Sequence, residues 1–276
     1  MCFFTPTIKK KRYLQKIIRF MKVVCSLAVV PIRKEASDKS EMTSQLLFGE
    51  SAQIIESNDK WHLVQTEHDQ YTGWVDKKQV EAYVEHDLAE NKICTAPLLI
   101  AQNAYNGYVF IPAGSLLKVM NDSTIVCGNK KFACNAGELK NATAPAELAL
   151  AALIFMDTPY LWGGRTLMGI DCSGFTQLIF RIAGHKIPRD AFQQVEIGET
   201  INFIAEAKTG DLAFFDNAEG RITHVGLIVK QESGDFTIIH ASGKVRMDKL
   251  DHNGIFNIET AEYSHNLRTI KRVIQD

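Results

Sequence analysis

The stretch YLWGGRTLMGIDCSGF, from Tyr160 to Phe175, places one cysteine after a run of glycines and directly before a helix-like segment. A buried structural thiol needs no such setting. A reactive thiol needs a turn that exposes its sulfur and a helix start whose unpaired N–H groups and dipole favour the thiolate. We therefore predict that Cys172 is a nucleophile with a lowered pKa and that the segments around it form the fold of a thiol enzyme.

The segments on either side of this stretch predict a mixed helical and stranded domain. Apolar spacing predicts one helix over 145–156, which ends where a proline follows, and a second over 172–184 with one apolar face. Apolar runs between turn residues then predict strands at 211–216, 224–230 and 235–242. Two helices followed by antiparallel strands make an α+β domain.

Two histidines on the predicted strands are candidates for the base that a cysteine nucleophile needs. His224 shares a strand face with Gly226, which leaves room beside the imidazole, and His240 lies near the end of the next strand. We predict a triad of Cys172, His224 and His240, in which His224 takes the proton and His240 holds its tautomer. A lone strand histidine is more often a core or rim residue. That interpretation is kept for the other six histidines, His62, His68, His86, His185, His252 and His265.

The N-terminal half carries two sets of short alternating segments that predict small β-barrels. The first set covers 23–84, with VVCSLAVVPI, SQLLFGE, AQIIES, WHLVQTE and YTGWVD separated by polar turns. The second set covers 93–139, where GSLLKVM, from Gly114, resembles GESAQIIE, from Gly49. We therefore predict an internal duplication of one module.

The composition describes a globular chain without a strong charge field. The 276 residues are 46% apolar, and 31 Lys and Arg residues against 32 Asp and Glu residues leave a formal charge of -1. This balance argues against a nucleic-acid partner and favours small molecules or peptides. The six cysteines show no C-x-x-C pair and no zinc-ligand spacing, so no metal and no cofactor are expected, while their even number leaves disulfides open.

The first 21 residues are predicted to be a disordered leader. Basic residues precede an apolar run there, but Lys22 interrupts the run and no small-residue cleavage site follows, so an export signal is not favoured. The alternation of basic and apolar residues over 8–21 leaves a membrane-surface helix as the alternative. No run of 18 uncharged apolar residues occurs, so no stable membrane insertion is expected. We expect a monomer in the cytoplasm, with the cell envelope or periplasm as the alternative location.

Six motifs in the C-terminal half occur in the order found in a known family. They are Tyr160 with LWGG, then GIDCSGF, PRDAFQQ, GDLAFF, THVGLIV and IIHASG. Together they resemble the NlpC-type cell-wall cysteine peptidases, while PIRKEASDKSEMTSQLLFGE, KWHLVQTE and YTGWV resemble bacterial SH3-like domains. The resemblance implies an α+β papain-like cysteine peptidase domain at 144–276, preceded by a leader at 1–21 and two SH3-like barrels at 22–86 and 87–143, the second of them divergent.

The resemblance also implies roles for residues of the catalytic domain. Cys172 would be the nucleophile, His224 the base and His240 the polar third member of the triad. The Tyr160 phenol would sit near the oxyanion together with the Cys172 backbone N–H, where negative charge develops. Trp162 would shape the turn and the wall of the pocket.

Further residues are implied as substrate contacts. Asp171 and Ser173 would help to bind the free amine of an N-terminal L-Ala, because an ammonium in a partly desolvated pocket needs a carboxylate or several acceptors. Glu50 and Tyr71 of the first barrel would close the same pocket, with a surface glutamate and a core tyrosine as the alternatives. Arg165 would either neutralise a substrate carboxylate or cap a loop.

By this resemblance the chain is expected to be a γ-D-glutamyl-L-diamino acid endopeptidase acting on murein peptides with a free N-terminal L-Ala. The Cys172 thiolate would attack the γ-carbonyl of D-Glu, His224 would protonate the leaving amine, and water would hydrolyse the thioester. Two alternatives stay open from the sequence. One is transfer of the acyl group to an amine or alcohol, and the other is a non-catalytic wall-binding protein with a vestigial peptidase domain.

Overall fold

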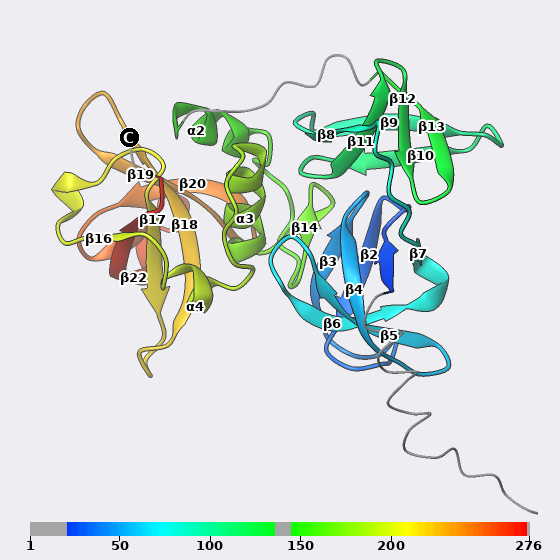
Figure 1. The fold of residues 1–276 in the computed structure, drawn as a ribbon. Coiled ribbons are helices and arrows are strands. Elements are labelled where there is room, and N and C mark those ends of the chain that lie inside the picture. Colours follow the sequence, from blue (N-terminus) through cyan, green and yellow to red (C-terminus); the bar gives the residue numbers. More distant parts are fainter. Residues whose placement is uncertain (1–20, 136–144, 275–276) are drawn as a thin grey trace, which may run out of the picture. The chain divides into compact units, whose positions relative to one another are not determined.

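The computed structural model describes residues 21–135 and 145–274, and the chain divides into two compact units. The first unit comprises residues 1–92, 99–111 and 115–138, and the second comprises 93–98, 112–114 and 139–276. In Figure 1 the barrel strands run from blue to green and the C-terminal helices and strands from green to red. The predicted leader lies outside the described residues, apart from Met21.

The first predicted barrel is a seven-stranded antiparallel sheet with the strand order β3-β2-β6-β5-β4-β1-β7. Its elements are β1 (Lys22–Val24), β2 (Val29–Arg33), β3 (Met42–Leu47), β4 (Ser51–Ser57), β5 (Trp61–Thr66), β6 (Thr72–Asp76), the 3-10 turn η1 (Lys77–Gln79) and β7 (Glu81–Ala82). Successive side chains of a strand face opposite sides, so the alternating apolar residues meet in one core. That core includes Val30, Ile32, Leu46, Ile54, Val64 and Val75.

The second predicted barrel is a six-stranded sheet with the order β10-β9-β13-β12-β11-β8. Its strands are β8 (Glu90–Ile93), β9 (Leu98–Asn103), β10 (Tyr108–Pro112), β11 (Leu116–Asn121), β12 (Thr124–Cys127) and β13 (Lys130–Ala133). If β8 to β13 are matched to β1 to β6 in turn, this order is the same as that of the first six strands of the other sheet. The predicted internal duplication is therefore confirmed by the topology.

The duplication extends to the turn that precedes the fourth strand of each module. Gly49 and Gly114 stand just before β4 and β11, with φ of 76° and 80°. Their N–H groups donate to the carbonyl oxygens of Cys25 at 2.8 Å and Cys94 at 2.7 Å, respectively. A Cβ on Gly49 would lie 1.7 Å from the Leu116 carbonyl oxygen, so this turn requires glycine both for its φ and for the close approach of the two modules.

The helices of the second unit are close to those predicted from the sequence. They are α2 (Pro145–Leu153), α3 (Cys172–Ile182) and α4 (Ala191–Gln194), with the 3-10 turn η2 (Ile204–Glu206). The predicted helix over 145–156 ends earlier because its last N–H groups bond three residues back, which tightens the chain into turns. Phe155 of this turn packs edge-on against Phe175 of α3, with ring centroids 6.1 Å apart.

The strands of the second unit form a sheet with the order β16-β22-β17-β18-β19-β20-β21. They are β16 (Glu199–Ile201), β17 (Leu212–Asp216), β18 (Ile222–Lys230), β19 (Phe236–Ser242), β20 (Lys244–Leu250), β21 (Gly254–Asn257) and β22 (Glu262–Arg272), beside a small hairpin of β14 (Arg165–Thr166) and β15 (Gly169–Ile170). Because β22 pairs with β17 and also with β21, the sheet closes on itself.

This closed sheet has an apolar core and carries α3 against two of its strands. The core includes Ala213, Phe215, Ile228, Ile238, Leu250, Ile255 and Ile270. Helix α3, every residue of which is buried, contacts β18 and β19, beside which it lies in Figure 1. The predicted strands at 211–216, 224–230 and 235–242 are present as β17, β18 and β19, and the fold therefore brings the start of α3 to the histidine-bearing strands.

Candidate active site

The glycine-rich stretch before α3 brings backbone segments too close together for side chains. A Cβ on Gly164 would lie 2.4 Å from the carbonyl oxygen of Gly169, and a Cβ on Gly174 would lie 2.4 Å from that of Gly164. The carboxylate of Asp171, the N-cap residue, accepts the Gly174 N–H at 2.7 Å. Cys172 is therefore the first residue of the helix, as the sequence predicts.

The Cys172 thiol is buried, with 7% of the residue exposed, and its Sγ lies 4.0 Å from the Thr223 carbonyl oxygen of β18. Burial, followed by the charge of Asp171, raises the pKa of Cys172 to about 12, although the N–H groups of Val225 and Ser173 act in the opposite direction. The predicted lowering of this pKa is wrong for the resting structure, because loss of hydration outweighs the helix-start N–H groups. A neutral thiol of this kind needs a base when it attacks.

Strands β18 and β19 bring the two predicted histidines together. His224 Nε2 lies 2.8 Å from His240 Nδ1, and both residues are buried. Gly226 lies opposite His240 in the sheet, where a Cβ would lie 2.7 Å from the Ile238 side chain and 2.9 Å from the His240 Cβ. His224 directly follows Thr223, whose carbonyl oxygen lies near the Cys172 thiol. The fold therefore brings the Cys172 thiol to the strand that carries His224, while the direct contact between the thiol and the imidazole stays a prediction.

The histidine pair continues into a buried ion pair on β20 that the sequence did not single out. His240 Nε2 lies 3.0 Å from Asp248 Oδ2, and Asp248 is fully buried. Arg246 Nε donates to Asp248 Oδ2 at 2.6 Å, and Arg246 Nη2 donates to Oδ1 at 3.0 Å. Although burial raises it, hydrogen bonds from His240 and Arg246 hold the pKa of Asp248 well below its usual range. In the sequence RMD, residues 246–248, Arg246 and Asp248 are two residues apart and so share a face of a strand, but the strand itself was not predicted.

A third imidazole, that of His265 on β22, stacks on His224. The ring centroids are 4.3 Å apart and the ring planes are inclined by 22°. Burial, followed by the charge of His240, lowers the pKa of His265 to about 4. Burial, followed by His240 and His265, lowers the pKa of His224 well below its usual range. His224 and His265 are therefore neutral at neutral pH, and His224 is able to accept a proton.

Tyr160 lies close enough to the thiol for the two groups to influence each other. Burial, followed by the charges of Cys172 and Asp171, raises the pKa of Tyr160 to about 12, so its phenol is protonated and able to donate. Its backbone N–H donates to the Gly243 carbonyl oxygen at 2.9 Å, and it bridges to Ile170 beside it. These contacts hold Tyr160 next to the start of α3, where a donor to an oxyanion would be needed.

The carboxylate of Asp171 already has several donors. Arg189 Nη1 and Nη2 donate to its Oδ1 at 2.9 Å and Oδ2 at 2.6 Å, and the N–H groups of Gly163 and Gly174 bond the same two oxygens. Arg189 Nη1 also donates to Ser173 Oγ at 2.9 Å. A carboxylate offers about four lone-pair positions, so a substrate ammonium would share oxygens that are already bonded. Amine binding by Asp171 and Ser173 stays a prediction, and Arg189 is a partner that the sequence reasoning missed although it lies in the PRDAFQQ motif.

The other two predicted residues of this unit differ in exposure. Trp162 is 60% exposed, as a residue of a pocket wall would be, whereas Arg165 is 2% exposed within the β14–β15 hairpin. Arg165 is therefore an interior residue, and its predicted contact with a substrate carboxylate stays a prediction.

Glu50 and Tyr71 belong to the first unit and have structural contacts within it. Glu50 is 3% exposed, and its Oε2 accepts the Leu47 N–H at 2.8 Å, so the alternative of a surface glutamate is wrong. The Tyr71 side chain packs against the barrel core and its N–H donates to Thr66 Oγ1 at 2.9 Å. Their predicted part in closing the substrate pocket stays a prediction.

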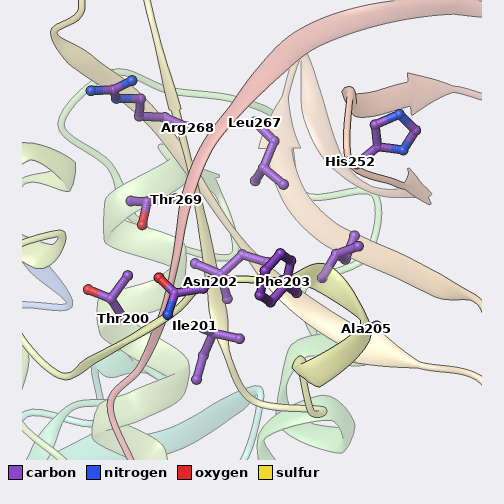
Figure 2. A pocket seen from close by; sticks show the side chains of 11 residues that line it. Thr200, Ile201, Asn202, Phe203, Ala205, His252, Leu267, Arg268 and Thr269 are labelled. Atoms are coloured by element: carbon purple, nitrogen blue, oxygen red, sulfur yellow. The ribbon is translucent and has the colours of Figure 1, made fainter.

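A pocket of about 500 Å³ lies elsewhere in the second unit (Figure 2). It is formed by β16, η2, the turn with His252 and the C-terminal part of β22, and it is lined by Phe203, Leu267 and Arg268 among others. None of its lining residues is a predicted site residue, so this pocket carries no part of the triad.

Comparison with known proteins identifies two domains in the chain. Residues 157–261, which include Tyr160, Cys172, His224 and His240, match the NlpC/P60 family, and residues 32–80 match the bacterial dipeptidyl-peptidase Sh3 domain. The chain carries an NlpC/P60 cysteine peptidase domain.

Relatives of this NlpC/P60 peptidase include two proteins named γ-D-glutamyl-L-lysine dipeptidyl-peptidase. The protein from Bacillus subtilis is 29% identical over 217 residues, which cover 67% of this chain and 69% of the relative. The protein from Bacillus cereus is 24% identical over 241 residues, which cover 74% of this chain and 68% of the relative. A probable endopeptidase p60 from Listeria monocytogenes is 39% identical over 92 residues, 30% of this chain and 19% of its own.

Solved structures of the same family share the fold. An NlpC/P60 family protein from Bacillus cereus superposes with a TM-score of 0.76 at 18% identity, covering 92% of this chain and all of that one. An NlpC/P60 endopeptidase from Photobacterium damselae subsp. piscicida gives a TM-score of 0.65 at 16% identity, covering 90% and 70%. The predicted papain-like domain with SH3-like barrels before it is thereby confirmed. Among the described residues of the NlpC/P60 peptidase, none of the helices has the length and apolar character to span a membrane.

Proposed function

We propose that this NlpC/P60 peptidase hydrolyses the bond between the γ-carboxyl of D-Glu and an L-diamino acid, lysine or diaminopimelate, in murein peptides with a free N-terminal L-Ala. The observation that carries the proposal is the 4.0 Å contact of the Cys172 thiol with the Thr223 carbonyl oxygen of β18, directly before His224, whose Nε2 is hydrogen-bonded to His240 Nδ1. The two Bacillus relatives, which match about two thirds of the chain or more, bear names that state this type of bond.

In the proposed first step, Cys172 Sγ attacks the γ-carbonyl carbon while its proton passes to His224. The transfer accompanies the attack, because burial keeps the thiol protonated and the imidazole unprotonated in the resting protein. The carbonyl oxygen gains negative charge, toward which the protonated Tyr160 phenol and the Cys172 backbone N–H would donate. The carbon–nitrogen bond then breaks, and His224 returns the proton to the departing amine, leaving a thioester on Cys172.

In the proposed second step, water hydrolyses the thioester. His224 takes a proton from the water as its oxygen attacks the acyl carbon. The carbon–sulfur bond breaks, the proton passes to the departing thiolate, and the dipeptide with its D-Glu carboxylate is released. The same imidazole therefore acts as base and as acid in both steps, which requires it to be neutral at rest, as burial keeps His224.

Recognition of the free amino end would fall to residues beside the nucleophile. Asp171 and Ser173 stand beside the nucleophile, and their oxygens accept hydrogen bonds from Arg189. We propose that these oxygens take part in binding the ammonium of L-Ala. Requirement for that ammonium would restrict the enzyme to free peptides, because the L-Ala of intact wall is linked through its nitrogen to the glycan.

The test is mass spectrometry of digests of synthetic L-Ala-γ-D-Glu-L-Lys and its diaminopimelate counterpart. We expect release of the L-Ala-γ-D-Glu dipeptide and of the free diamino acid, and no release by the Cys172→Ala variant. N-acetylated tripeptide and intact sacculi serve as matched substrates without the free amine, and we expect both to be left uncut. Hydrolysis that persists in Cys172→Ala would refute the proposal.

Acyl transfer is separated from hydrolysis in the same assay by adding an amine such as glycylglycine. A hydrolase gives the free dipeptide acid whether or not the amine is present. A product joined to the added amine in excess of the free acid would assign the chain to transfer instead.

A further inference from the structure

The two histidines of the predicted triad and the groups behind them form one continuous chain of hydrogen bonds. It runs from His224 on β18 through His240 on β19 to Asp248 and Arg246 on β20, with successive donor–acceptor distances of 2.8, 3.0 and 2.6 Å. Arg246 lies opposite His240 in the sheet, and Asp248 lies opposite Ile238, one step along the same face. Asp248 is 0% exposed, so no water competes for its carboxylate.

The order of donors and acceptors in this chain follows from the carboxylate at its end. An ionised carboxylate accepts hydrogen bonds and donates none, so the hydrogen between His240 and Asp248 belongs to His240 Nε2. A neutral imidazole has one N–H, so His240 Nδ1 is an acceptor, and the hydrogen between the two rings belongs to His224 Nε2. His224 Nδ1 is then left with its lone pair, which is what a base for the Cys172 thiol needs.

We propose that Asp248, held by Arg246, is a positioning residue that sets the tautomers of His240 and His224 and so keeps His224 Nδ1 free to accept the Cys172 proton. The inference rests on the proposed function in taking Cys172 as the nucleophile, and it applies to any acyl donor that the thiol attacks.

Arg246 has a separate part in this arrangement. A lone carboxylate beside an imidazole favours the imidazolium form. Protonated His240 would donate from both nitrogens, which would reverse the hydrogen between the rings and leave His224 with its hydrogen on Nδ1. The guanidinium of Arg246 bonds both oxygens of Asp248 and offsets its charge.

The other ionisable groups around His240 do not supply a competing charge. His224 on β18 and His265 on β22 face it, and both are neutral because burial lowers their pKa values. Glu259, which follows β21, accepts a hydrogen bond from Arg246 Nη1 at 3.0 Å. The charge that His240 meets is therefore set by Asp248 and Arg246.

The substitution Asp248→Asn tests the tautomer assignment because its geometry is constrained. Asp248 Oδ1 accepts both Arg246 Nη2–H and the Ile258 backbone N–H, the latter at 3.0 Å. The amide oxygen of the variant keeps these two donors, which turns the amide N–H toward His240 Nε2 with loss of the single bond from Arg246 Nε. His240 then has to carry its hydrogen on Nδ1, and His224 has to carry its hydrogen on Nδ1 as well, so the base is lost.

Nitrogen-15 NMR of the histidine rings in the full chain reads these tautomers without any substrate. We expect both His224 and His240 to be protonated on Nε2 in the unaltered protein, and both on Nδ1 in Asp248→Asn. Asp251→Asn is the matched control, since Asp251 follows β20 directly and bonds Tyr263 rather than a histidine. We expect it to leave both rings unchanged. Unchanged tautomers in Asp248→Asn, or Nδ1–H on His224 in the unaltered protein, would overturn the inference.

The rate of Cys172 alkylation by iodoacetamide, measured against pH with Cys172→Ala as background, supplies the functional reading. Loss of a correctly oriented base through an acid-to-amide change costs up to about 10⁴-fold in a comparable triad, and we expect a fall of at least about 100-fold at pH 7 in Asp248→Asn. Arg246→Gln keeps the base but favours protonated His240. We therefore expect its Cys172 alkylation rate to match that of the unaltered protein at high pH. As the pH is lowered, the rate in Arg246→Gln should fall at a higher pH than it does in the unaltered protein.

These measurements separate the inference from the proposed function. Changed tautomers and slower alkylation support the positioning role even if the murein tripeptide is not cut, in which case the proposed substrate alone is wrong. A thermal melt checks that each variant is folded. If Asp248→Asn does not fold, the test uses Arg246→Gln. The inference is overturned if the alkylation rate of Arg246→Gln falls at the same pH as that of the unaltered protein.

Discussion

The buried ion pair between Arg189 and Asp171 is expected to be the most sensitive structural contact near the nucleophile. The two side chains are 1% and 8% exposed, and two hydrogen bonds of 2.9 and 2.6 Å join them. Arg189→Met removes the guanidinium and keeps an unbranched side chain of similar length, so little packing is lost. The carboxylate is left buried with only the backbone N–H groups of Gly163 and Gly174 as described donors, besides the Ser173 hydroxyl at 3.5 Å.

The magnitude follows from leaving a charge buried without its partner. Removal of one member of a buried pair costs about 3–5 kcal/mol of unfolding free energy. At about 2–4 °C per kcal/mol for a domain of this size, the melting temperature of the C-terminal unit should fall by roughly 10 °C. The double variant Asp171→Asn/Arg189→Met removes the charge while asparagine still serves as an N-cap, so most of the loss should be recovered.

Thermal and urea unfolding of the four proteins of this cycle, followed by circular dichroism, measure the loss and the recovery. The same proteins report on the thiol, because Asp171 raises the pKa of Cys172 after burial does, and Arg189 lowers it. Alkylation of Cys172 should therefore need a higher pH in Arg189→Met and a lower pH in the double variant. A loss below about 1 kcal/mol in Arg189→Met, or a double variant no more stable than the single one, would refute the reasoning.

Three further outcomes are expected. The unfolding free energy should fall as the pH is lowered from about 6.5 to about 4. The unfolded chain takes up its histidine protons near 6.5, whereas His265 in the folded protein resists protonation until about 4. In urea titrations at several pH values, His265→Phe should make the unfolding free energy less dependent on pH, and the substitution of the exposed His252 by Phe should not. Gly226→Ala should cost about 1–3 kcal/mol in urea unfolding and slow Cys172 alkylation, because its Cβ would press on side chains of β19; unchanged stability would show that β19 yields freely. Gly49→Ala should lower the melting temperature of the barrels, since its Cβ would meet a carbonyl oxygen at 1.7 Å and its φ is 76°, and an unchanged melt would contradict the close approach.

Local patterns were sufficient for much of the fold. The period of two in the apolar runs predicted β17, β18 and β19, and the apolar face of the run that starts at Cys172 predicted α3. The similarity around Gly49 and Gly114 predicted the duplicated module, because the same turn needs the same residue type in each copy. Such signals are carried by neighbours in the chain, so they can be read before any tertiary contact is known.

The triad residues were also named from the sequence, by motif and by strand phase. Phase places His224 and His240 on one face of two strands, but the 2.8 Å contact between their rings depends on the register of β18 against β19 and on the space at Gly226. The sequence predicts a core or rim residue at His265, which stacks on the same ring, because nothing in its own segment shows that β22 closes the sheet beside β17.

Strand register and burial, which only the tertiary structure shows, decided the ion pairs near the site and the protonation of Cys172. The ion pair of Asp248 and Arg246 reaches His240 because β20 pairs with β19, and Arg189 reaches Asp171 across 18 residues of sequence. The resting protonation of Cys172 was mispredicted for the same reason: a helix start favours a thiolate, but the packing of α3 on β18 removes the water that the charge would need. Dehydration of that sulfur comes from segments 50 residues away along the chain, so no local pattern contains it.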